Sequence, residues 1–339
     1  MTGKIVIKRI LSRVLSFSGI HSLAERISFS NKALILMYHR ILPSSDNQPY
    51  FIQPGMFVST ASFERQIVFL KDRFEVVFLE DLVEKAMKGE NIGGLCAITF
   101  DDGWRDNFTD AFPILSKYRV PATIFLATGF VGTEKIFWPE ELCYYLDRNR
   151  LDTASFSSAP QSYIRFSKEI SRYRQCIQET FLDRSIEIMK GYPPGTRDEI
   201  LRYLRSMHKT DSIPRQMLSW DEVREMLSSG QVQFGAHTVN HEILDQIPLD
   251  KVRNEISRSR AEIENRLGGT IRTFAYPNGN YNESARKILE ENGITVAVTT
   301  KKGFFDRNTN HMEIPRIAIH EDVSSTIPMF RSKTLFPQF

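Results

Sequence analysis

Residues 95–103 read LCAITFDDG, a mostly apolar run that ends in two aspartates and a glycine. Leu95–Phe100 has the length and the nearly unbroken hydrophobicity of a strand that is buried on both faces. The sequence therefore predicts a central strand here. Asp101, Asp102 and Gly103 are expected in the loop at its C-terminal end.

Working outward from this strand, apolar runs alternate with segments of helical period. Strands are expected at 33–38, 74–79, 95–100, 122–127, 232–235, 271–276, 294–299 and 314–319. Helices are expected at 62–73, 80–88, 106–118, 219–229, 250–267 and 282–292. This alternation predicts an α/β fold with a parallel sheet and helices outside it. About seven strand–helix units favour an incomplete or distorted (β/α) barrel, with its chemistry in the loops after the strands.

The domain organisation follows from where this alternation stops. Residues 139–216 are mostly helical and charged, which indicates a helical insertion into a barrel made of residues 31–138 and 217–325. Residues 1–30 are expected to form a basic amphipathic N-terminal helix, and 326–339 are expected to be a C-terminal tail.

The N-terminal segment has two readings. Ile7, Ile10, Leu11, Val14 and Leu15 fall on one helical face, and Lys8, Arg9, Ser12, Arg13 and Ser16 fall on the other. Such a helix either packs on the barrel or rests on an anionic inner membrane leaflet. No run approaches the ~18 apolar residues of a membrane span, and no secretory signal is evident. We therefore expect a cytoplasmic protein, peripheral at the inner face of the membrane in the second reading.

Composition excludes several classes of protein. The chain has 339 residues, of which 41% are hydrophobic and 25% charged, as in a globular protein. A net charge of +3 is too weak to indicate a nucleic-acid partner. The three cysteines are scattered, which argues against a disulfide framework or a zinc knuckle.

Two polar pairs follow predicted strands. His237 and His241 are spaced so that one helical turn would bring both imidazoles to the same side, where they and a carboxylate could bind a divalent cation. Asp101 and Asp102 are adjacent, so their carboxylates point different ways: one could bind the cation while the other accepts a proton from water. In the alternative reading these pairs are ordinary loop and turn residues.

The segments TFDDG at 99–103 and HTVNH at 237–241 resemble the first two motifs of the polysaccharide deacetylase family, also called the NodB homology domain or carbohydrate esterase family four. FAYPNG at 274–279 resembles its third motif. The likeness covers roughly residues 33–138 and 217–320. It implies that Asp102, His237 and His241 bind the metal, usually Zn²⁺, with Co²⁺, Ni²⁺ or Mn²⁺ as alternatives.

The resemblance also implies roles for the groups around the metal. Asp101 would be the general base. His39, in the segment MYHRI, would be the catalytic acid, with His320 near the C-terminus as its rival.

The third motif departs from the family pattern, because the arginine that orients the base is missing before Pro277. Arg316 is expected to supply that cation from the last strand. Tyr276 is a candidate oxyanion donor through its backbone N–H. Residues expected to bind substrate are Trp104, Trp220 and Pro277, with Trp138 as a further aromatic; each tryptophan could instead pack in the core.

The expected function is metal-dependent removal of N-acetyl groups from amino sugars of a polysaccharide or a lipid-linked glycan. One alternative is an amidohydrolase or O-acetyl esterase that acts on a smaller substrate. Another is an inactive glycan-binding protein. The sequence leaves the sugar, its linkage and the oligomeric state open.

Overall fold

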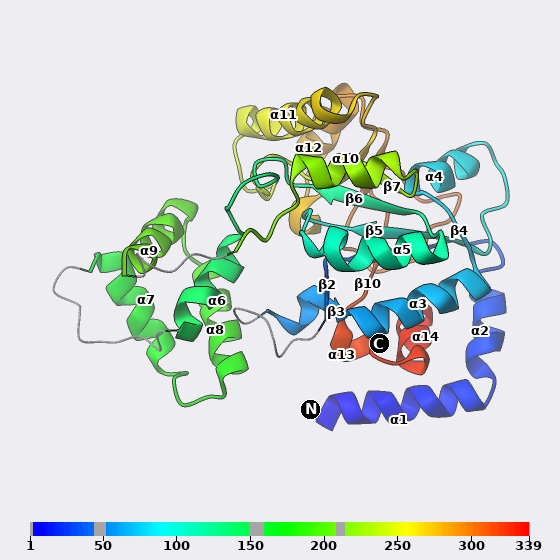
Figure 1. Ribbon diagram of the computed structural model, residues 1–339, viewed down its shortest axis with the longest axis horizontal. Helices are drawn as coiled ribbons and strands as arrows, with labels where there is room; N and C mark the ends of the chain where they lie inside the picture. The colour runs from blue at the N-terminus through cyan, green and yellow to red at the C-terminus, as the bar shows by residue number, and fades with distance from the viewer. Residues whose placement is uncertain (1–2, 44–51, 149–158, 208–213, 339) are drawn as a thin grey trace. The chain divides into compact units, whose positions relative to one another are not determined.

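The computed structural model describes residues 3–43, 52–148, 159–207 and 214–338, which fall into two units (Figure 1). The first unit holds the chain up to Pro43, Pro54–Thr133 and the chain from Met217. The second unit is Glu134–Gln216 together with the segment that ends at Gln53. Every residue expected to bind metal or to act in catalysis lies in the first unit, together with Trp104, Trp220 and Pro277, whereas Trp138 lies in the second unit.

The first unit is built on one parallel sheet. Its strands follow the order β10-β1-β5-β6-β7-β8-β9, and the short strand β4 pairs with the start of β5. These strands are β1 (Leu34–Tyr38), β4 (Glu75–Val76), β5 (Leu95–Phe100), β6 (Ala122–Leu126), β7 (Val232–Ala236), β8 (Thr273–Ala275), β9 (Val296–Val298) and β10 (Ile317–Ala318). A separate parallel pair joins β2 (Arg40–Leu42) to β3 (Phe57–Ser59).

One segment brings the two edges of this sheet together. Ile314 forms a parallel bridge with Val298 of β9. Three residues later, Ile317 pairs with Leu36 of β1. Because the same stretch bonds to both β9 and β1, the sheet curls around, and the expected incomplete or distorted (β/α) barrel is confirmed.

Alternation along the strands separates two apolar layers. Side chains such as Leu36, Ile98 and Leu126 join the large core cluster beneath the helices. Ile35, Ala97 and other residues of opposite parity form a second cluster. Both faces of the sheet are buried, which explains why β5 reads as a nearly continuous apolar run.

Helices cover the outer face of the sheet; Figure 1 shows α3, α5 and α10 beside it. They are α3 (Thr60–Arg73), α4 (Leu79–Met87), α5 (Phe112–Tyr118), α10 (Trp220–Ser228), α11 (Leu249–Leu267) and α12 (Glu283–Glu291). Short turns are η1 (Pro54–Met56), the π-helical η2 (Asn107–Ala111) and η4 (Pro277–Gly279). The predicted helices agree with these bounds within a few residues, except that the first turns of the one expected at 106–118 are π-helical.

The two ends of the chain differ from expectation. The N-terminal segment forms two helices, α1 (Gly3–Phe17) and α2 (Ile20–Ser28), because Gly19 adopts φ 76° between them. The expected C-terminal tail contains α14 (Ile327–Leu335), preceded by α13 (Glu321–Ser324). Met329–Leu335 are buried, so this segment belongs to the folded unit; residue 339 lies outside the described residues.

The second unit is helical. Its helices are α6 (Trp138–Arg148), α7 (Gln161–Ser171), α8 (Gln178–Lys190) and α9 (Pro194–Met207). The expected insertion at 139–216 also includes 149–158 and 208–213, which lie outside the described residues. In the part of the chain that the structure describes, no helix combines the length and the apolar character needed to cross a membrane.

Candidate metal and catalytic site

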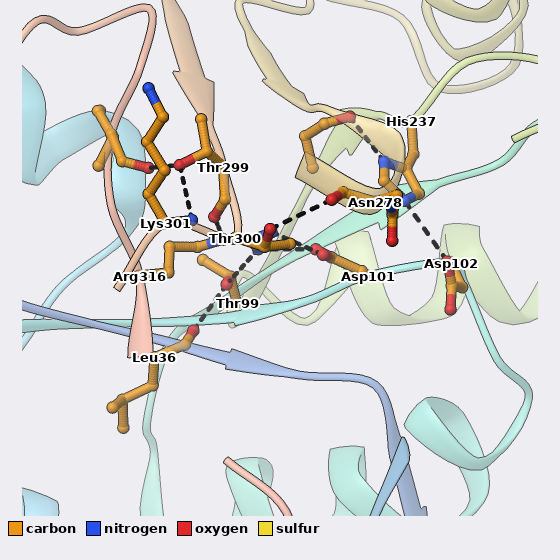
Figure 2. A network of polar contacts seen from close by, with 12 residues as sticks. Leu36, Thr99, Asp101, Asp102, His237, Asn278, Thr299, Thr300, Lys301 and Arg316 are labelled. Carbon is orange, nitrogen blue, oxygen red and sulfur yellow. Dashed lines mark hydrogen bonds and ion pairs between the residues drawn. The ribbon is translucent and has the colours of Figure 1, made fainter. Parts of the chain in front are cut away.

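The strands of a parallel barrel all end at one rim, and here that rim collects the polar residues singled out in the sequence. His39 follows β1, Asp101 and Asp102 follow β5, and His237 follows β7. Arg316 lies on the segment that closes the barrel, just before β10. In Figure 2, Arg316 lies to the left of Asp101, and a dashed line joins His237 to Asp102.

Asp101 is held by a two-pronged ion pair. Arg316 Nη1 donates to Asp101 Oδ1 at 2.7 Å, and Nη2 donates to Oδ2 at 2.6 Å. Arg316 is fully buried, and its other hydrogen bonds run to Thr99 Oγ1 at 2.9 Å and to the Thr299 carbonyl at 3.0 Å. Strand alternation places Thr99 and Asp101 on the same side of β5, so the guanidinium reaches both. Arg316 therefore places a cation beside Asp101 from the segment that closes the barrel.

Asp102 points the other way, toward two imidazoles. Its Oδ1 lies 3.4 Å from His237 Nε2 and 3.4 Å from His241 Nε2. One ligand atom from each of the three residues lies within 4.8 Å of the other two. A positive φ of 79° at Asp102 turns the chain between the two aspartates and separates their directions.

The expected helical turn at His237–His241 is wrong. These residues form a loop with positive φ at Thr238 (63°) and His241 (56°). The buried carboxylate of Glu255 on α11 stabilises this loop: it accepts backbone N–H bonds from Val239 and Asn240 at 2.8 Å each and a side-chain bond from Asn240 at 2.7 Å. The imidazoles are brought together by tertiary contacts, which an i, i+4 spacing cannot reveal.

His237 is already oriented for ligation. Its Nδ1 lies 2.6 Å from the Ala275 carbonyl, and a carbonyl can only accept, so Nδ1 carries the hydrogen. Nε2 is then the ligating atom; it is buried and makes no hydrogen bond within the described residues. A buried nitrogen lone pair of this kind beside a carboxylate and a second imidazole fits a divalent cation.

Burial and neighbouring charges determine the ionisation of the aspartates. Burial by itself would raise the pKa of Asp101, but the charge and hydrogen bonds of Arg316 outweigh it and hold that pKa below its usual value. Burial is likewise overcome at Asp102, where His237, His241 and His39 lower the pKa. Both carboxylates are therefore anionic near neutral pH.

The two imidazoles differ in ionisation. Burial favours neutral His237, but Asp102 and Asp101 prevail and raise its pKa. Burial dominates at His241 and, with only partial compensation by Asp102, lowers its pKa to about 4. His241 is thus a neutral ligand, whereas a proton competes with a cation at His237.

The prediction that Trp104 binds substrate is wrong. This side chain is fully buried, so it cannot stack on a sugar. Instead its Nε1–H donates to Asp102 Oδ2 at 2.9 Å, and the guanidinium of Arg40 lies 4.3 Å from its ring centre. Arg40 in turn pairs with buried Asp106, Nε to Oδ2, at 2.8 Å. This chain of contacts fixes the side of Asp102 that faces away from the imidazoles.

Three other expectations concern the third motif and Trp220. The Tyr276 backbone N–H donates to the Val298 carbonyl at 3.1 Å, so the expectation that it holds an oxyanion is wrong. Pro277 is buried, which leaves it no surface for a substrate. Trp220 is half-buried at the start of α10, where Arg266 lies 5.4 Å from its ring centre; it packs against the core.

His39 and His320 differ in their surroundings. His39 is half-buried after β1, its charge helps to lower the pKa of both aspartates, and its carbonyl accepts from Asn107 Nδ2 at 2.8 Å. His320 Nδ1 contacts Asp322, two residues further along the chain. His39 is thus close enough for its charge to act on both aspartates.

Sequence reasoning missed Glu255, Thr99 and Thr299. Thr99 lies within the first motif, and its hydroxyl links Arg316 to the Leu36 carbonyl. Nothing distinguishes Glu255 from the other glutamates of α11 along the sequence. Only its burial against the histidine loop reveals its part in the site.

Comparisons with known proteins agree with this geometry. The profile described as "Polysaccharide deacetylase" matches residues 88–297. The poly-beta-1,6-N-acetyl-D-glucosamine N-deacetylase of Staphylococcus aureus (strain MRSA252) is 22% identical over 308 residues, covering 86% of this chain and 80% of that protein.

Two solved structures share the fold. The Streptococcus pyogenes deacetylase PplD, in complex with acetate, superposes with a TM-score of 0.57 at 21% identity, covering 90% of this chain and 99% of that one. IcaB from Ammonifex degensii gives 0.57 at 19% identity, covering 89% and 97%.

Proposed function

The chain belongs to the polysaccharide deacetylase family, and from that premise we propose that it hydrolyses N-acetyl groups on amino sugars of a glycan, either a polymer or a lipid-linked precursor. One observation carries the proposal: Asp102, His237 and His241 converge beside a second carboxylate, Asp101, that is fixed separately by Arg316. The name of the Staphylococcus aureus relative, a poly-beta-1,6-N-acetyl-D-glucosamine N-deacetylase, supports a substrate built from N-acetylated hexosamines.

The donor set supports a divalent cation. His237 Nε2, His241 Nε2 and Asp102 Oδ1 would hold it, since two imidazoles and one carboxylate leave coordination positions open for water and substrate. Imidazole and carboxylate ligands suit Zn²⁺, and also Co²⁺, Ni²⁺ or Mn²⁺. When bound, such a cation lowers the pKa of a water and polarises the acetyl carbonyl.

Asp101 is the proposed general base. Its carboxylate is anionic because Arg316 stabilises the charge against burial. The same two hydrogen bonds orient it, so it can accept the proton of the attacking water without reorganising. Arg316 is a positioning residue in this scheme, because it acts through Asp101.

His39 is the proposed general acid. The amide bond breaks productively only when the departing nitrogen gains a proton, because an amine leaves far more easily than its anion. An imidazolium at His39, beside the two aspartates, would donate that proton. Water then contributes one hydroxyl to acetate and one proton to the base, while the sugar amine receives its proton from the acid.

Two alternatives are weaker. An amidohydrolase or O-acetyl esterase would use the same groups, but the family and the named relative favour an N-acetylated glycan. An inactive glycan-binding protein has no use for an ionised base held by a buried arginine.

Acetate release from N-acetylglucosamine oligomers tests the base. Asp101→Asn should reduce turnover by roughly 10²–10⁴-fold, the usual contribution of a general base, while bound cation stays unchanged. Asp221→Asn, at a side chain that is 90% exposed, is the matched control. Near-normal turnover in Asp101→Asn would remove this residue from the mechanism.

Elemental analysis tests the ligands independently of activity. The double variant His237→Ala/His241→Ala should lose its stoichiometric cation, because Asp102 alone is a weak site. If the double variant keeps one tightly bound ion per chain, these residues are not the ligands.

A further inference from the structure

The helices α1 and α2 turn their apolar side chains away from the protein. Phe17 is 91% exposed, Ile7 and Ile27 are each 66% exposed, and Leu23 is 62% exposed. The complete set of these side chains, here called the α1–α2 face, is Val6, Ile7, Ile10, Leu11, Val14, Phe17, Ile20, Leu23 and Ile27. An exposed apolar set of this size on consecutive helices indicates a binding surface.

The polar sides of the same helices face the protein. On α1 the residue opposite the apolar arc is Ser12, which is fully buried. On α2, buried His21 Nε2 lies 2.9 Å from Ser332 Oγ of α14. Glu25 accepts two hydrogen bonds from Arg331 of α14, at 2.7 and 2.9 Å. Figure 1 shows α1 and α2 outside α14, at the border of the first unit.

This orientation is the reverse of that of an ordinary surface helix, which buries its apolar stripe. At ~100° per residue, the exposed apolar side chains of α1 span an arc of ~140°. Polar contacts therefore attach the helix pair to α14, and the apolar arc remains for a partner.

The charges beside the arc indicate which partner fits. Arg13 and Arg26 are exposed on the two helices. Glu25 is the sole acidic residue in residues 3–28 of the sequence, and its charge is paired with Arg331. The surroundings of the α1–α2 face are therefore positive.

We propose that the α1–α2 face lies in the headgroup region of an anionic lipid bilayer, with its apolar side chains among the acyl chains and its arginines at the phosphates. Helices with a wide apolar arc and basic edges bind in this way. A second copy of the chain would bring like charges together, which disfavours self-association. The proposal rests on exposure and charge alone and stands whether or not the chemistry proposed at the rim is correct.

Vesicle flotation tests it directly. The full chain should float with vesicles of equal parts phosphatidylcholine and phosphatidylglycerol, and much less with phosphatidylcholine alone. Binding should weaken as salt rises, because exposed charges are screened. Failure to float with the anionic vesicles, or equal binding to both kinds, would overturn the proposal.

A triple variant tests the surface itself. Ile10→Ser/Val14→Ser/Phe17→Ser should reduce partitioning by roughly 10-fold or more, because each side chain loses its transfer into the acyl region. These residues are already exposed, so thermal unfolding should be unchanged, and it is measured alongside to confirm folding.

A control variant replaces exposed apolar residues elsewhere. Val68→Ser/Met87→Ser/Leu249→Ser changes side chains that are 46%, 63% and 55% exposed on α3, α4 and α11. This variant should float like the wild type. Equal loss of binding in both triple variants would show that vesicle binding does not depend on the α1–α2 face.

Sedimentation equilibrium tests the alternative partner, a second copy of the chain. A stable dimer that the Ile10→Ser/Val14→Ser/Phe17→Ser variant converts to monomer would show that a second copy covers the face, and would overturn the lipid proposal. A wild-type monomer that floats with anionic vesicles supports it.

Discussion

Adjacent aspartates at the end of β5 have opposite environments. Asp101 is enclosed by the guanidinium of Arg316, whereas Asp102 faces two imidazoles and the Trp104 N–H. A single positive φ at Asp102 permits this division. A conformation of this kind is costly outside glycine, so its presence at the rim is consistent with a functional role.

Replacing Arg316 should change the pH profile of the reaction. Arg316 does most to hold the pKa of Asp101 down against burial. In Arg316→Met only the weaker influences of His237 and His39 still oppose burial, so that pKa should rise. The acidic limb of kcat/KM should then move to higher pH, and turnover at neutral pH should fall by roughly 10²-fold. The measurement is kcat/KM for acetate release across pH.

Arg316→Lys is the companion variant. It keeps the positive charge but loses the two-pronged geometry, so its acidic limb should move less than that of Arg316→Met. A loss of rate with no movement of the limb in either variant would mean that Arg316 matters only for folding.

The surroundings of His39 and His320 lead to a second prediction at the scale of residues. His39→Asn should lower kcat by roughly 10²-fold or more, because the departing amine loses its proton donor. His320→Asn is the control, since His320 contacts Asp322, and it should stay within about 2-fold of the wild type. The reverse ranking of the two variants would exchange the roles of these histidines.

Residue types and spacing predicted much of the site because a metal site needs specific donors. The aspartate pair, His237 and His241 could be singled out on that basis. The resemblance to the deacetylase family then assigned Asp102 to the cation, and the arginine missing from the third motif pointed to Arg316. Trp104 and Tyr276 were misjudged because sequence does not show which polar atoms are already used: the indole N–H bonds Asp102, and the Tyr276 N–H bonds β9.

At the scale of elements, α11 positions the histidine loop through a single buried carboxylate. Glu255 accepts two backbone N–H bonds and one side-chain bond from the loop. Glu255→Ala leaves these donors unpaired, and cation affinity should fall by roughly 10–100-fold, as for other residues that orient ligands. Competition with a chromogenic chelator measures that affinity.

The same helix offers a control. Glu262 pairs only with the neighbouring Arg266 among the contacts of its carboxylate in the described chain, and its side chain is 40% exposed. Glu262→Ala should leave cation affinity unchanged. Equal affinities in the Glu255→Ala and Glu262→Ala proteins would show that the loop holds its shape without α11.

Elements with a clear apolar period were predictable, and short or polar ones were not. The bounds of β5 were predicted in full because both of its faces are buried. β10 is only two residues long, since hydrogen bonds to β9 occupy the first part of its segment. α14 was missed because Arg331, Ser332 and Lys333 read as exposed, although α1 and α2 cover them.

At the scale of the whole molecule, α14 is an internal helix with polar residues. Lys333 is 4% exposed, and its ammonium group donates to the Pro337 carbonyl at 3.0 Å. Burial, together with the charges of Lys302 and Lys8, lowers the pKa of Lys333 to about 8 from 10.5. Folding therefore works against a charge on this lysine at neutral pH.

This linkage predicts how stability depends on pH. Between pH 8 and 10.5 the unfolded chain binds the proton and the folded chain does not, so the contribution of Lys333 to the free energy of unfolding rises with pH across that window. Below about pH 8 Lys333 is charged in the folded chain as well, and the full cost of burying that charge reduces the free energy of unfolding. Lys333→Met should raise the free energy of unfolding at pH 7 by about 2 kcal/mol, and urea unfolding at pH 7 and 10 measures it.

A surface lysine is the control for this effect. Lys287→Met, at a side chain that is 65% exposed, should change stability by no more than about 0.5 kcal/mol at either pH. If Lys333→Met destabilises the protein at pH 7, the hydrogen bond to Pro337 outweighs the burial of the charge.

The segment that closes the barrel also sets an order of events during synthesis. Asp101 and Arg316 are 215 positions apart, so a ribosome has made β1 to β9 before the guanidinium emerges. Until then the proposed base has neither its counter-ion nor its fixed orientation, and the rim lacks one of its walls. A nascent chain is therefore expected to be inactive toward a glycan, and to become able to hydrolyse one only when the final strand has been added.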